Sequence, residues 1–312
     1  IVIVNDWTPD NSAIIAKEYE AKYPSVIRVI DQENRGHGGA WNHGTELAVG
    51  KYLFYLDSDD WFDTDELSKL IDYLKTVDTD MVMMDDTSYN ANTDKYSIGN
   101  TKHRDFTPEK VYEADKFDWL GSGHGWNMTY AHDTVYRTAM LQKYLPIFCE
   151  HVMYDDVSLQ AIPIAIAKDL IYTKLNVYRY YIGREGQSFD PKVRAKRAAN
   201  DVGKVLEFIL RWYRIHWDAI PTGGTREAYS KDMRQSCGSW HYYELCEFPL
   251  KISGPALREW DKLIKTEFPE IEIDRNIRLY RALPAWMFVY WIRFNRLYNK
   301  GIRFIKRKLH IK

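Results

Sequence analysis

The sequence of 312 residues is poor in cysteine and contains no long apolar segment. Its three cysteines, Cys149, Cys237 and Cys246, form neither a CxxC pair nor a Cys/His ligand pattern, which argues against a disulfide scaffold and a structural zinc site. No run of 18 apolar residues occurs, so no membrane-spanning helix is predicted. The first residues lack the features of a signal peptide and an initiator Met, and we expect the numbered chain to begin inside a longer protein.

The composition is that of a soluble protein with a sizeable core, because 45% of the residues are hydrophobic and 28% are charged. At roughly 150 residues per domain, the length predicts about two domains, or one large α/β domain with an appendage. The net charge of −1 hides an asymmetry: residues 1–156 carry 14 basic and 28 acidic residues, whereas residues 157–312 carry 29 and 16. A carboxylate-rich half suits metal ions, and a basic half suits phosphates or an anionic membrane surface, although solvated surfaces explain most single charges.

Strand and helix patterns alternate over the first 85 residues. We expect strands at Ile1–Val4, Val26–Ile30, Tyr52–Leu56 and Met81–Met84. Helices are expected at Ala13–Tyr23, at Ala40–Ala48 and, after a capping-box-like start at Asp63 and Glu66, as far as Val77. This alternation predicts an α/β fold with a parallel sheet that binds ligands at the carboxyl ends of its strands. Residues 86–130 are expected to form loops with one hairpin, residues 170–182 strands, and the chain beyond about 195 helices.

An acidic motif, Asp57-Ser58-Asp59-Asp60, directly follows the third expected strand. Three carboxylates at the end of a strand repel one another unless a cation or hydrogen-bond donors compensate them. Hard oxygen ligands at this spacing suit Mg²⁺ or Mn²⁺, with substrate phosphates completing the shell. A helix N-terminus is the alternative explanation, and it accounts better for the acids from Asp63 onward.

Two further motifs contain turn-forming and glycine residues. The first runs from Asn5 to Ser12 and, taken alone, is explained as a turn followed by a helix cap. The second, from Asn34 to Gly44, has three glycines within four residues, which allow the backbone to approach a ligand closely. It is not a Walker loop, because no Gly-Lys-Ser/Thr follows, and a flexible loop is the alternative.

Together, these three ordered motifs resemble those of the family 2 glycosyltransferases. That family has D-D-G-S-T-D-N-S after a strand, then N-x-G-x-x-x-A-R-N-x-G, then A-x-G-x-Y-(I/L)-x-F-L-D-S-D-D. The matching stretches are Asn5–Ser12, Asn34–Gly44 and Ala48–Asp60. The resemblance is strong over residues 1–85, weaker over 130–190 and absent after about 195. It implies a GT-A domain over residues 1–190, and the helical pattern of the remaining chain predicts a helical C-terminal region over residues 191–312.

The resemblance also implies roles for single residues. Asp6 would contact the uracil or ribose, and Asn34, Gly36 and Asn42 would help to bind the nucleotide sugar. Asp59 would face the ribose and the metal, and Asp60 would be a ligand of Mn²⁺ or Mg²⁺. The cation would stabilise the diphosphate leaving group as the sugar–phosphate bond breaks.

Inverting transfer also needs a general base for the acceptor hydroxyl. The family places it in a downstream acidic pair, which corresponds here to Asp155-Asp156; Asp156 is the expected base, with Asp155 as the fallback. The stretch from Tyr180 to Ser188 resembles the family's Y-x-x-R-x-G-S-x-S segment, and Arg184 would then bind the diphosphate. A helix-start acid pair and a surface arginine are the respective alternatives.

The chain departs from the family pattern at three places. A first strand ending in P-x-Y-N, which would lie in the middle of the sheet, is absent from the numbered chain. Trp7 replaces the usual Gly, and Trp41 replaces the usual Arg of A-R-N. The loss of that arginine puts the identity of the nucleotide in question more than the fold.

The C-terminal stretch Trp291–Lys312 alternates basic residues with aromatic and aliphatic ones. Such a basic amphipathic helix suits an anionic membrane surface, and packing on the protein's own core is the equal alternative. No nucleic-acid-binding motif accompanies it.

The sequence therefore predicts a metal-dependent, inverting hexosyl- or N-acetylhexosaminyltransferase. By resemblance, the donor would be a UDP-sugar and the acceptor a glycan or lipid-linked glycan used in bacterial surface polysaccharides. The expected location is the cytoplasm, with peripheral contact to the plasma membrane. A nucleotidyltransferase on a related fold and a non-catalytic glycan- or partner-binding module remain the alternatives.

Overall fold

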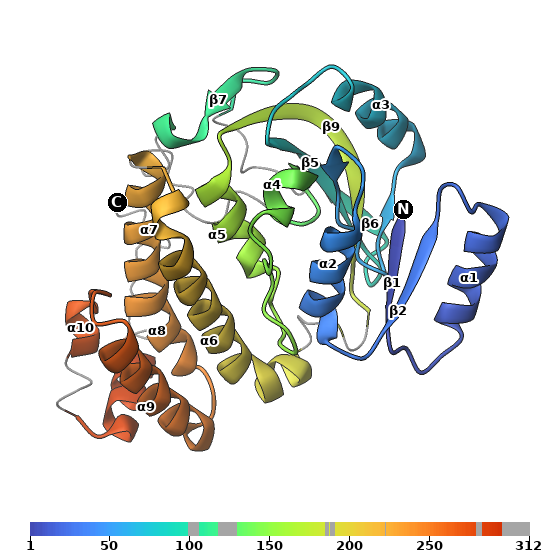
Figure 1. Cartoon of the computed structure of the whole chain (residues 1–312). Helices are drawn as coiled ribbons and strands as arrows, with labels where there is room; N and C mark the ends of the chain where they lie inside the picture. The colour runs from blue at the N-terminus through green and yellow to red at the C-terminus, as the bar shows by residue number, and fades with distance from the viewer. Residues whose placement is uncertain are drawn as a thin grey trace, which may run out of the picture.

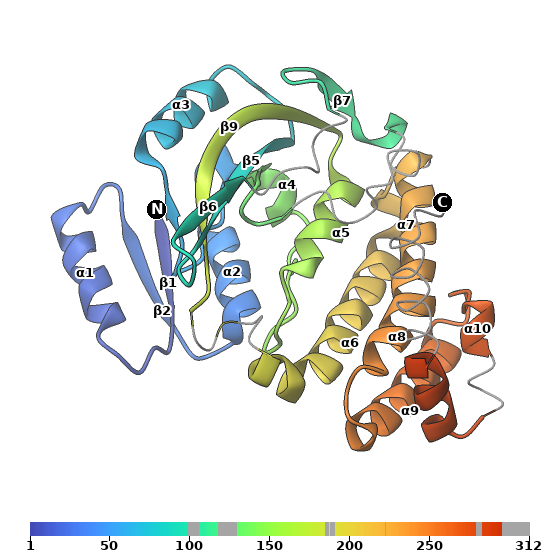
Figure 2. The same ribbon diagram turned by 180° about the vertical axis from the view of Figure 1, so that it is seen from behind.

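The computed structural model describes residues 1–98, 106–117, 130–184, 187, 191–221, 223–278 and 283–294. Figure 1 shows a large curved sheet in the middle of the molecule, with β1, β2 and α1 on one side and the helices from α6 to α10 on the other. The reverse view has the same arrangement, with α5 between the sheet and the C-terminal helices (Figure 2).

The N-terminal unit is a two-stranded parallel sheet. Its strands are β1 (Val2–Asp6) and β2 (Arg28–Gln32), joined by helix α1 (Ser12–Lys22). The second strand begins two residues later than predicted, because the backbone N–H groups of Val26 and Ile27 instead bond to the Tyr23 carbonyl oxygen. The predicted parallel pairing holds here, and it brings the carboxyl ends of the two strands together.

Helix α2 (Gly36–Leu47) begins four residues earlier than the predicted helix. Gly36 has a positive φ of 74°, a conformation open to glycine, and the glycine-rich stretch then forms the first turn of the helix. The predicted ligand-approach loop is therefore a helix N-terminus.

The large sheet has the strand order β3-β8-β5-β9-β4, with β6 added to β5 and β7 added to β9. Its strands are β3 (Tyr52–Leu53), β4 (Trp61–Phe62), β5 (Met81–Asn90), β6 (Lys95–Ile98), β7 (Val111–Glu113), β8 (Thr134–Arg137) and β9 (Asp169–Ile182). In this sheet only β5 and β9 pair in parallel, and the other pairs among the described residues are antiparallel. The α/β class is confirmed, but the sheet is mixed rather than mostly parallel, because β8 lies antiparallel between β3 and β5, and β4 and β7 pair antiparallel with β9.

Helices cover both faces of the large sheet. Helix α3 (Thr64–Leu74) starts as predicted, with the Asp63 carboxylate accepting a bond from the Glu66 N–H at 3.0 Å. It buries Leu70 in an apolar cluster with β5, β8 and β9 residues. The larger core lies on the other side, with α4 (Thr138–Gln142) and α5 (Val157–Ile166).

The C-terminal part is helical, as predicted. It contains α6 (Pro191–His216), α7 (Gly224–Gln235), a π-helical turn (Ser236–Trp240), α8 (His241–Leu245), α9 (Leu250–Glu267) and α10 (Arg275–Arg278). Short 3₁₀ turns occur at Ala114–Lys116 and Trp217–Ala219, and residues 285–294 are helical. Among helices within the described residues, none has the length and apolar character required to cross a bilayer.

Helix α6 packs directly on the sheet-bearing part of the chain. The Trp212 indole N–H donates to the Tyr144 carbonyl at 3.0 Å, and the Tyr213 hydroxyl donates to the Ala161 carbonyl at 2.8 Å. One buried apolar cluster runs through both parts. The division into domains at residues 190 and 191 therefore stays a prediction.

Candidate functional site

The predicted site residues come from five places in the fold. They lie at the carboxyl end of β1, just before and within α2, in the loop between β3 and β4, and just before α5. Arg184 follows β9. Side-chain contacts link these places, as the following distances show.

Asp6 lies at the end of β1, where it organises the neighbouring turn. One oxygen of its carboxylate accepts from the Gln32 side chain at 2.7 Å and from the Arg35 backbone N–H at 2.8 Å. The Asn34 amide donates to the Asp6 carbonyl at 3.1 Å. The first and second motifs are thus joined at the entry to α2.

The three carboxylates of the acidic motif have different partners. Asp57 Oδ1 lies 2.9 Å from His37 Nε2. Asp59 Oδ2 accepts from the Arg184 guanidinium at 2.7 Å. Asp60 accepts from the Tyr178 hydroxyl at 2.6 Å and from the Tyr181 backbone N–H at 2.7 Å. Asp60 therefore anchors the motif to β9, and Asp59 lies beside the guanidinium group of Arg184.

The electrostatics of this motif fit a divalent cation. Burial, together with the charges of Asp57 and Asp59, raises the pKa of Asp60 to about 6, although its hydrogen bonds with Tyr178 and Tyr181 oppose the shift. Crowded carboxylates of this kind are relieved by a bound cation. Asp59 and Asp60 are hard oxygen donors of the type that Mg²⁺ and Mn²⁺ prefer, and phosphate oxygens would complete the shell.

The second acidic pair lies where α5 begins. Asp155 is buried, with 3% of its surface exposed, whereas Asp156 is partly exposed. Burial and the neighbouring charge of Asp155 raise the pKa of Asp156 to about 6, while the charge of His37 opposes the shift. Among the described residues, no hydrogen bond holds the Asp156 carboxylate. A poised, unengaged carboxylate is the arrangement that a general base needs.

His37 joins the two acidic motifs. Its Nδ1 atom lies 2.9 Å from Asp155 Oδ2, and its Nε2 atom lies 2.9 Å from Asp57 Oδ1. The ring packs on Trp41 at a centroid distance of 4.1 Å, and Trp41 stacks on Tyr55 at 4.5 Å. His37 therefore bridges the acidic motif Asp57-Ser58-Asp59-Asp60, or DSDD motif, and the Asp155-Asp156 pair.

Helix α2 holds the segment that leads to this acidic pair. The Asn42 amide donates to the Phe148 carbonyl at 2.9 Å and accepts from the Ile147 and Phe148 N–H groups at 2.9 and 3.0 Å. Arg35 forms a two-pronged ion pair with Glu150.

Two residues of the second motif contact other segments of the same chain. Asn42 is 6% exposed and its amide holds the backbone of residues 147–148, and its role in nucleotide-sugar binding stays a prediction. A Cβ atom on Gly36 would lie 3.0 Å from the His151 nitrogen, so this glycine serves the docking of α2.

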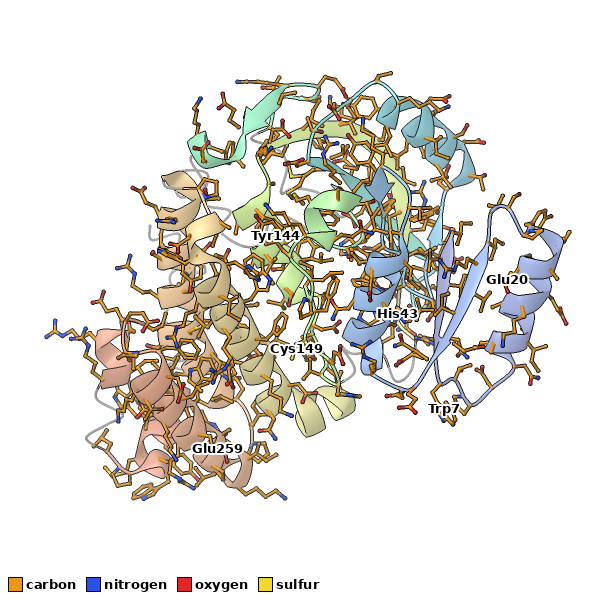
Figure 3. The ribbon with its side chains drawn as sticks, in the orientation of Figure 1. Trp7, Glu20, His43, Tyr144, Cys149 and Glu259 are labelled. Atoms are coloured by element: carbon orange, nitrogen blue, oxygen red, sulfur yellow. The ribbon has the colours of Figure 1, made fainter. Side chains whose placement is uncertain are left out.

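The two tryptophans that depart from the family pattern have opposite environments. Trp7 has a positive φ of 60° and is 72% exposed at the loop after β1, on the outside of the molecule (Figure 3). Trp41 instead packs between His37, Tyr55 and Phe148. The arginine expected at position 41 is thus replaced by part of an aromatic cluster that supports His37.

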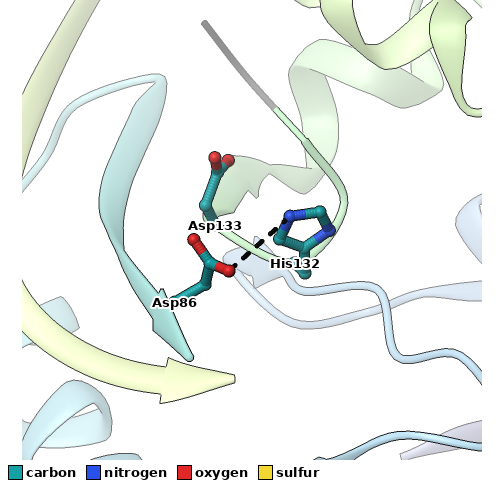
Figure 4. Close-up of side chains that lie close together, drawn as sticks. All are labelled: Asp86, His132 and Asp133. Carbon is teal, nitrogen blue, oxygen red and sulfur yellow. Dashed lines mark ion pairs between the residues drawn. The ribbon is translucent and has the colours of Figure 1, made fainter. Parts of the chain in front are cut away.

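A second group of potential metal ligands lies on β5 and before β8. Potential ligand atoms of Asp86, His132 and Asp133 all lie within 4.8 Å of one another (Figure 4). His132 Nε2 is 3.9 Å from Asp86, and its ring stacks on Tyr180 at 5.2 Å. Asp133 accepts hydrogen bonds from the Tyr130 N–H and the Thr134 hydroxyl, both at 2.7 Å. The group can hold a cation, and it also forms a satisfied internal network.

His37, Tyr178 and Glu150 take part in the contacts that join these motifs, and none of the three was predicted from the sequence. The signal for His37 was its place between Gly36 and Gly38, which lets a titratable ring approach a neighbouring segment. Tyr178 and Glu150 carry no local signal, because their roles arise from pairing between β9 and the acidic loop and from the docking of α2.

Comparisons with known proteins agree with the geometry. Residues 1–144 match the family model described as "Glycosyl transferase family 2". The chain is 31% identical over 206 residues to the protein named "Putative glycosyltransferase EpsH" of Bacillus subtilis, an alignment that covers 62% of this chain and 56% of that protein. It is also 48% identical over 60 residues to "Uncharacterized glycosyltransferase YibD" of Escherichia coli, covering 19% of this chain and 17% of that protein.

Solved structures share the fold at low sequence identity. S. aureus TarS is similar with a TM-score of 0.59 and 15% identity, covering 96% of this chain and 48% of that chain. TarS 1–349 in complex with UDP-GlcNAc gives a TM-score of 0.52 at 16% identity, with coverages of 88% and 83%. The chain spans about half the length of the first relatives it matches.

Proposed function

We propose that this chain, whose residues 1–144 match the model of glycosyl transferase family 2, transfers a hexosyl or N-acetylhexosaminyl group from a UDP-sugar to a hydroxyl of a glycan or lipid-linked glycan. The observation that carries the proposal is the approach of the two acidic motifs across His37. It supports a site with a diphosphate-binding side and a base on the other side. The solved relative with UDP-GlcNAc bound supports the choice of donor.

On the donor side, Asp6 lies at the end of β1, where it is suited to contact the uridine. Asp59 and Asp60 would hold Mn²⁺ or Mg²⁺, which supplies Lewis-acid stabilisation to the departing diphosphate. Arg184, which pairs with Asp59 at 2.7 Å, carries guanidinium donors suited to the same phosphates. Its exposed position allows it to exchange Asp59 for the diphosphate.

On the acceptor side, Asp156 takes the proton from the attacking hydroxyl as the new glycosidic bond forms and the bond to the diphosphate breaks. Its pKa of about 6 leaves it mostly ionised at neutral pH and basic enough to accept that proton. Attack from the face opposite to the leaving group inverts the anomeric centre. Asp155, tied to His37, keeps its place beside the base.

A donor panel tests this function. UDP-glucose, UDP-GlcNAc and GDP-mannose are incubated with the protein and Mn²⁺, with EDTA as the control, and nucleoside diphosphate release is measured with and without glycan acceptors. Release from a UDP-sugar that depends on metal and increases with acceptor supports the proposal. Absence of binding and turnover for every donor contradicts it, and pyrophosphate release from UTP would favour a nucleotidyltransferase.

We further propose that the basic C-terminal stretch contacts the inner face of a bacterial plasma membrane, where lipid-linked acceptors would be presented. Residues 295–312 lie outside the described residues. The preceding Ile292 is 4% exposed and the Arg293 guanidinium donates to the Cys246 carbonyl at 2.8 Å, so the start of the stretch packs on the core. A truncation after Phe294 leaves this packing in place.

The truncated protein should lose salt-sensitive binding to anionic liposomes while keeping its melting temperature. Sedimentation with vesicles containing phosphatidylglycerol measures this. Equal binding by both proteins would exclude the membrane role.

A further inference from the structure

The contacts of His37 require a particular protonation state. A neutral imidazole carries one N–H donor and one acceptor nitrogen, whereas a carboxylate only accepts. Both ring nitrogens of His37 lie 2.9 Å from carboxylate oxygens, one of Asp155 and one of Asp57. Only a doubly protonated ring satisfies both contacts.

The surroundings agree with a charged ring. Burial opposes the charge, yet the hydrogen bonds to Asp155 and Asp57 raise the pKa of His37 to about 10. The N-terminal end of the α2 dipole also opposes a cation at the second residue of the helix, so the two carboxylates are what keep the ring charged. The ring also lies beside Trp41, with the two ring centroids 4.1 Å apart and the ring planes tilted by 50°, and an aromatic ring at this distance favours a cation.

The backbone around His37 is built for this contact. A Cβ atom on Gly38 would lie 2.3 Å from the Cys149 carbonyl oxygen and 2.9 Å from Asp155 Oδ2. Any side chain at position 38 would therefore push the first turn of α2 away from the segment that carries the acidic pair. The close approach brings His37 to Asp155 and, through its other nitrogen, to Asp57.

We propose that His37 is a positioning residue, whose doubly protonated ring ties Asp155 to Asp57 and so leaves Asp156 as the one carboxylate of its pair free to accept the acceptor's proton. This proposal rests on the proposed function, because it gives the bridge that His37 forms between Asp155 and Asp57 a role in sugar transfer. The charges that act on Asp156 come from Asp155, His37, Asp57 and His132, and the two histidines are the ones that favour its ionised form.

Two variants of residues on helix α2 distinguish the loss of the His37 contacts from a general loss of stability. His37→Gln removes the charge and one of the two donors, and we expect kcat to fall about 10- to 100-fold while the Kd for UDP with Mn²⁺ stays within about twofold. His43→Gln is the matched control, because His43 lies on the same helix (Figure 3) and bonds to the uncharged Gln32 side chain at 2.7 Å. Equal kcat values for His37→Gln and the parent would overturn the proposal.

Chemical rescue gives a result that a merely structural role would not produce. His37→Ala leaves a ring-sized space at a partly exposed position, and added imidazole should restore several-fold activity. The ratio of rates with and without imidazole should be larger at pH 6 than at pH 8. The reason is that the imidazolium cation, which is more abundant at pH 6, can donate to both Asp155 and Asp57. Rescue that is absent, or that favours pH 8, would contradict the charged tie.

Nuclear magnetic resonance tests the tie independently of activity. In the ¹⁵N-histidine-labelled protein, His37 should have both ring nitrogens protonated at pH 8, and Asp155→Asn should return the ring toward a neutral form. A neutral His37 at pH 8 in the parent overturns the proposal. If His37 is charged but no sugar is transferred from any donor, the tie stands and the proposed function fails.

Discussion

Replacing Asn42 by Ala should detach α2 from the segment that carries the acidic pair. The substitution leaves three buried backbone groups without their partner: the N–H groups of Ile147 and Phe148 and the carbonyl of Phe148. Each such group costs about 1–3 kcal/mol when left unpaired, and partial relaxation lowers the total to about 3–5 kcal/mol. A loss of this size should lower the melting temperature by about 10 °C.

Thermal melting measures the loss, and hydrogen exchange of residues 147–156 locates it. Asn34→Ala is the control, because Asn34 is exposed and donates one hydrogen bond to the Asp6 carbonyl. The free energy of unfolding of this variant should differ from the parent's by less than about 0.5 kcal/mol. A melting temperature of Asn42→Ala within about 1 °C of the parent would refute the reasoning. If affinity for the donor fell instead, the initial expectation of a nucleotide-sugar contact would be correct.

Three further predictions follow from the same geometry. Asp60→Ala should abolish the Mn²⁺-dependent part of UDP binding, measured by calorimetric titration, because a hard oxygen ligand is lost; affinity equal to the parent's would remove Asp60 from the metal site. The rate at saturating acceptor should fall about tenfold per pH unit below pH 6, because protonation of Asp156 removes the base, and a flat profile from pH 5 to 8 would contradict its raised pKa. Gly38→Ala should lower both stability and transfer, because its Cβ would lie 2.3 Å from a backbone oxygen. The control Gly44→Ala, whose Cβ would have its nearest neighbouring atom at 3.5 Å, should be neutral or stabilising by about 0.4–1 kcal/mol. Equal melting temperatures for the two variants would show that the close approach at Gly38 is not required.

The sequence predicted the helices and most strands of the first 85 residues because their apolar periods are local. It missed the short strand β4 (Trp61–Phe62), and it extended the third strand to Leu56, although β3 ends at Leu53 and three residues separate it from the acidic motif. It did not predict that the large sheet is mixed, because β8 and β9 pair with β5 over separations of about 50 to 90 residues that leave no local pattern.

The chemistry of the second motif was also hidden from the sequence. Its glycines predicted close approach to a ligand, but in the structure they bring α2 close to residues 148–155 of the same chain. Asn42 matched a family position and was therefore assigned to the donor, and its burial and its three hydrogen bonds to the backbone could not be predicted from that match. Long-range docking of this kind becomes visible only in three dimensions.

The central claim is that Asp156 is the base of a sugar transfer whose donor is held by the DSDD side of the site. The most direct measurement compares transfer and UDP binding in the parent, Asp156→Asn and Asp155→Asn, with kcat and Kd determined for each. Asp156→Asn should keep the parental Kd for UDP with Mn²⁺ and lose about 10²–10⁴-fold in kcat, the usual contribution of a positioned base, with a smaller loss for Asp155→Asn. A fully active Asp156→Asn variant, with the larger loss in Asp155→Asn, would contradict the account.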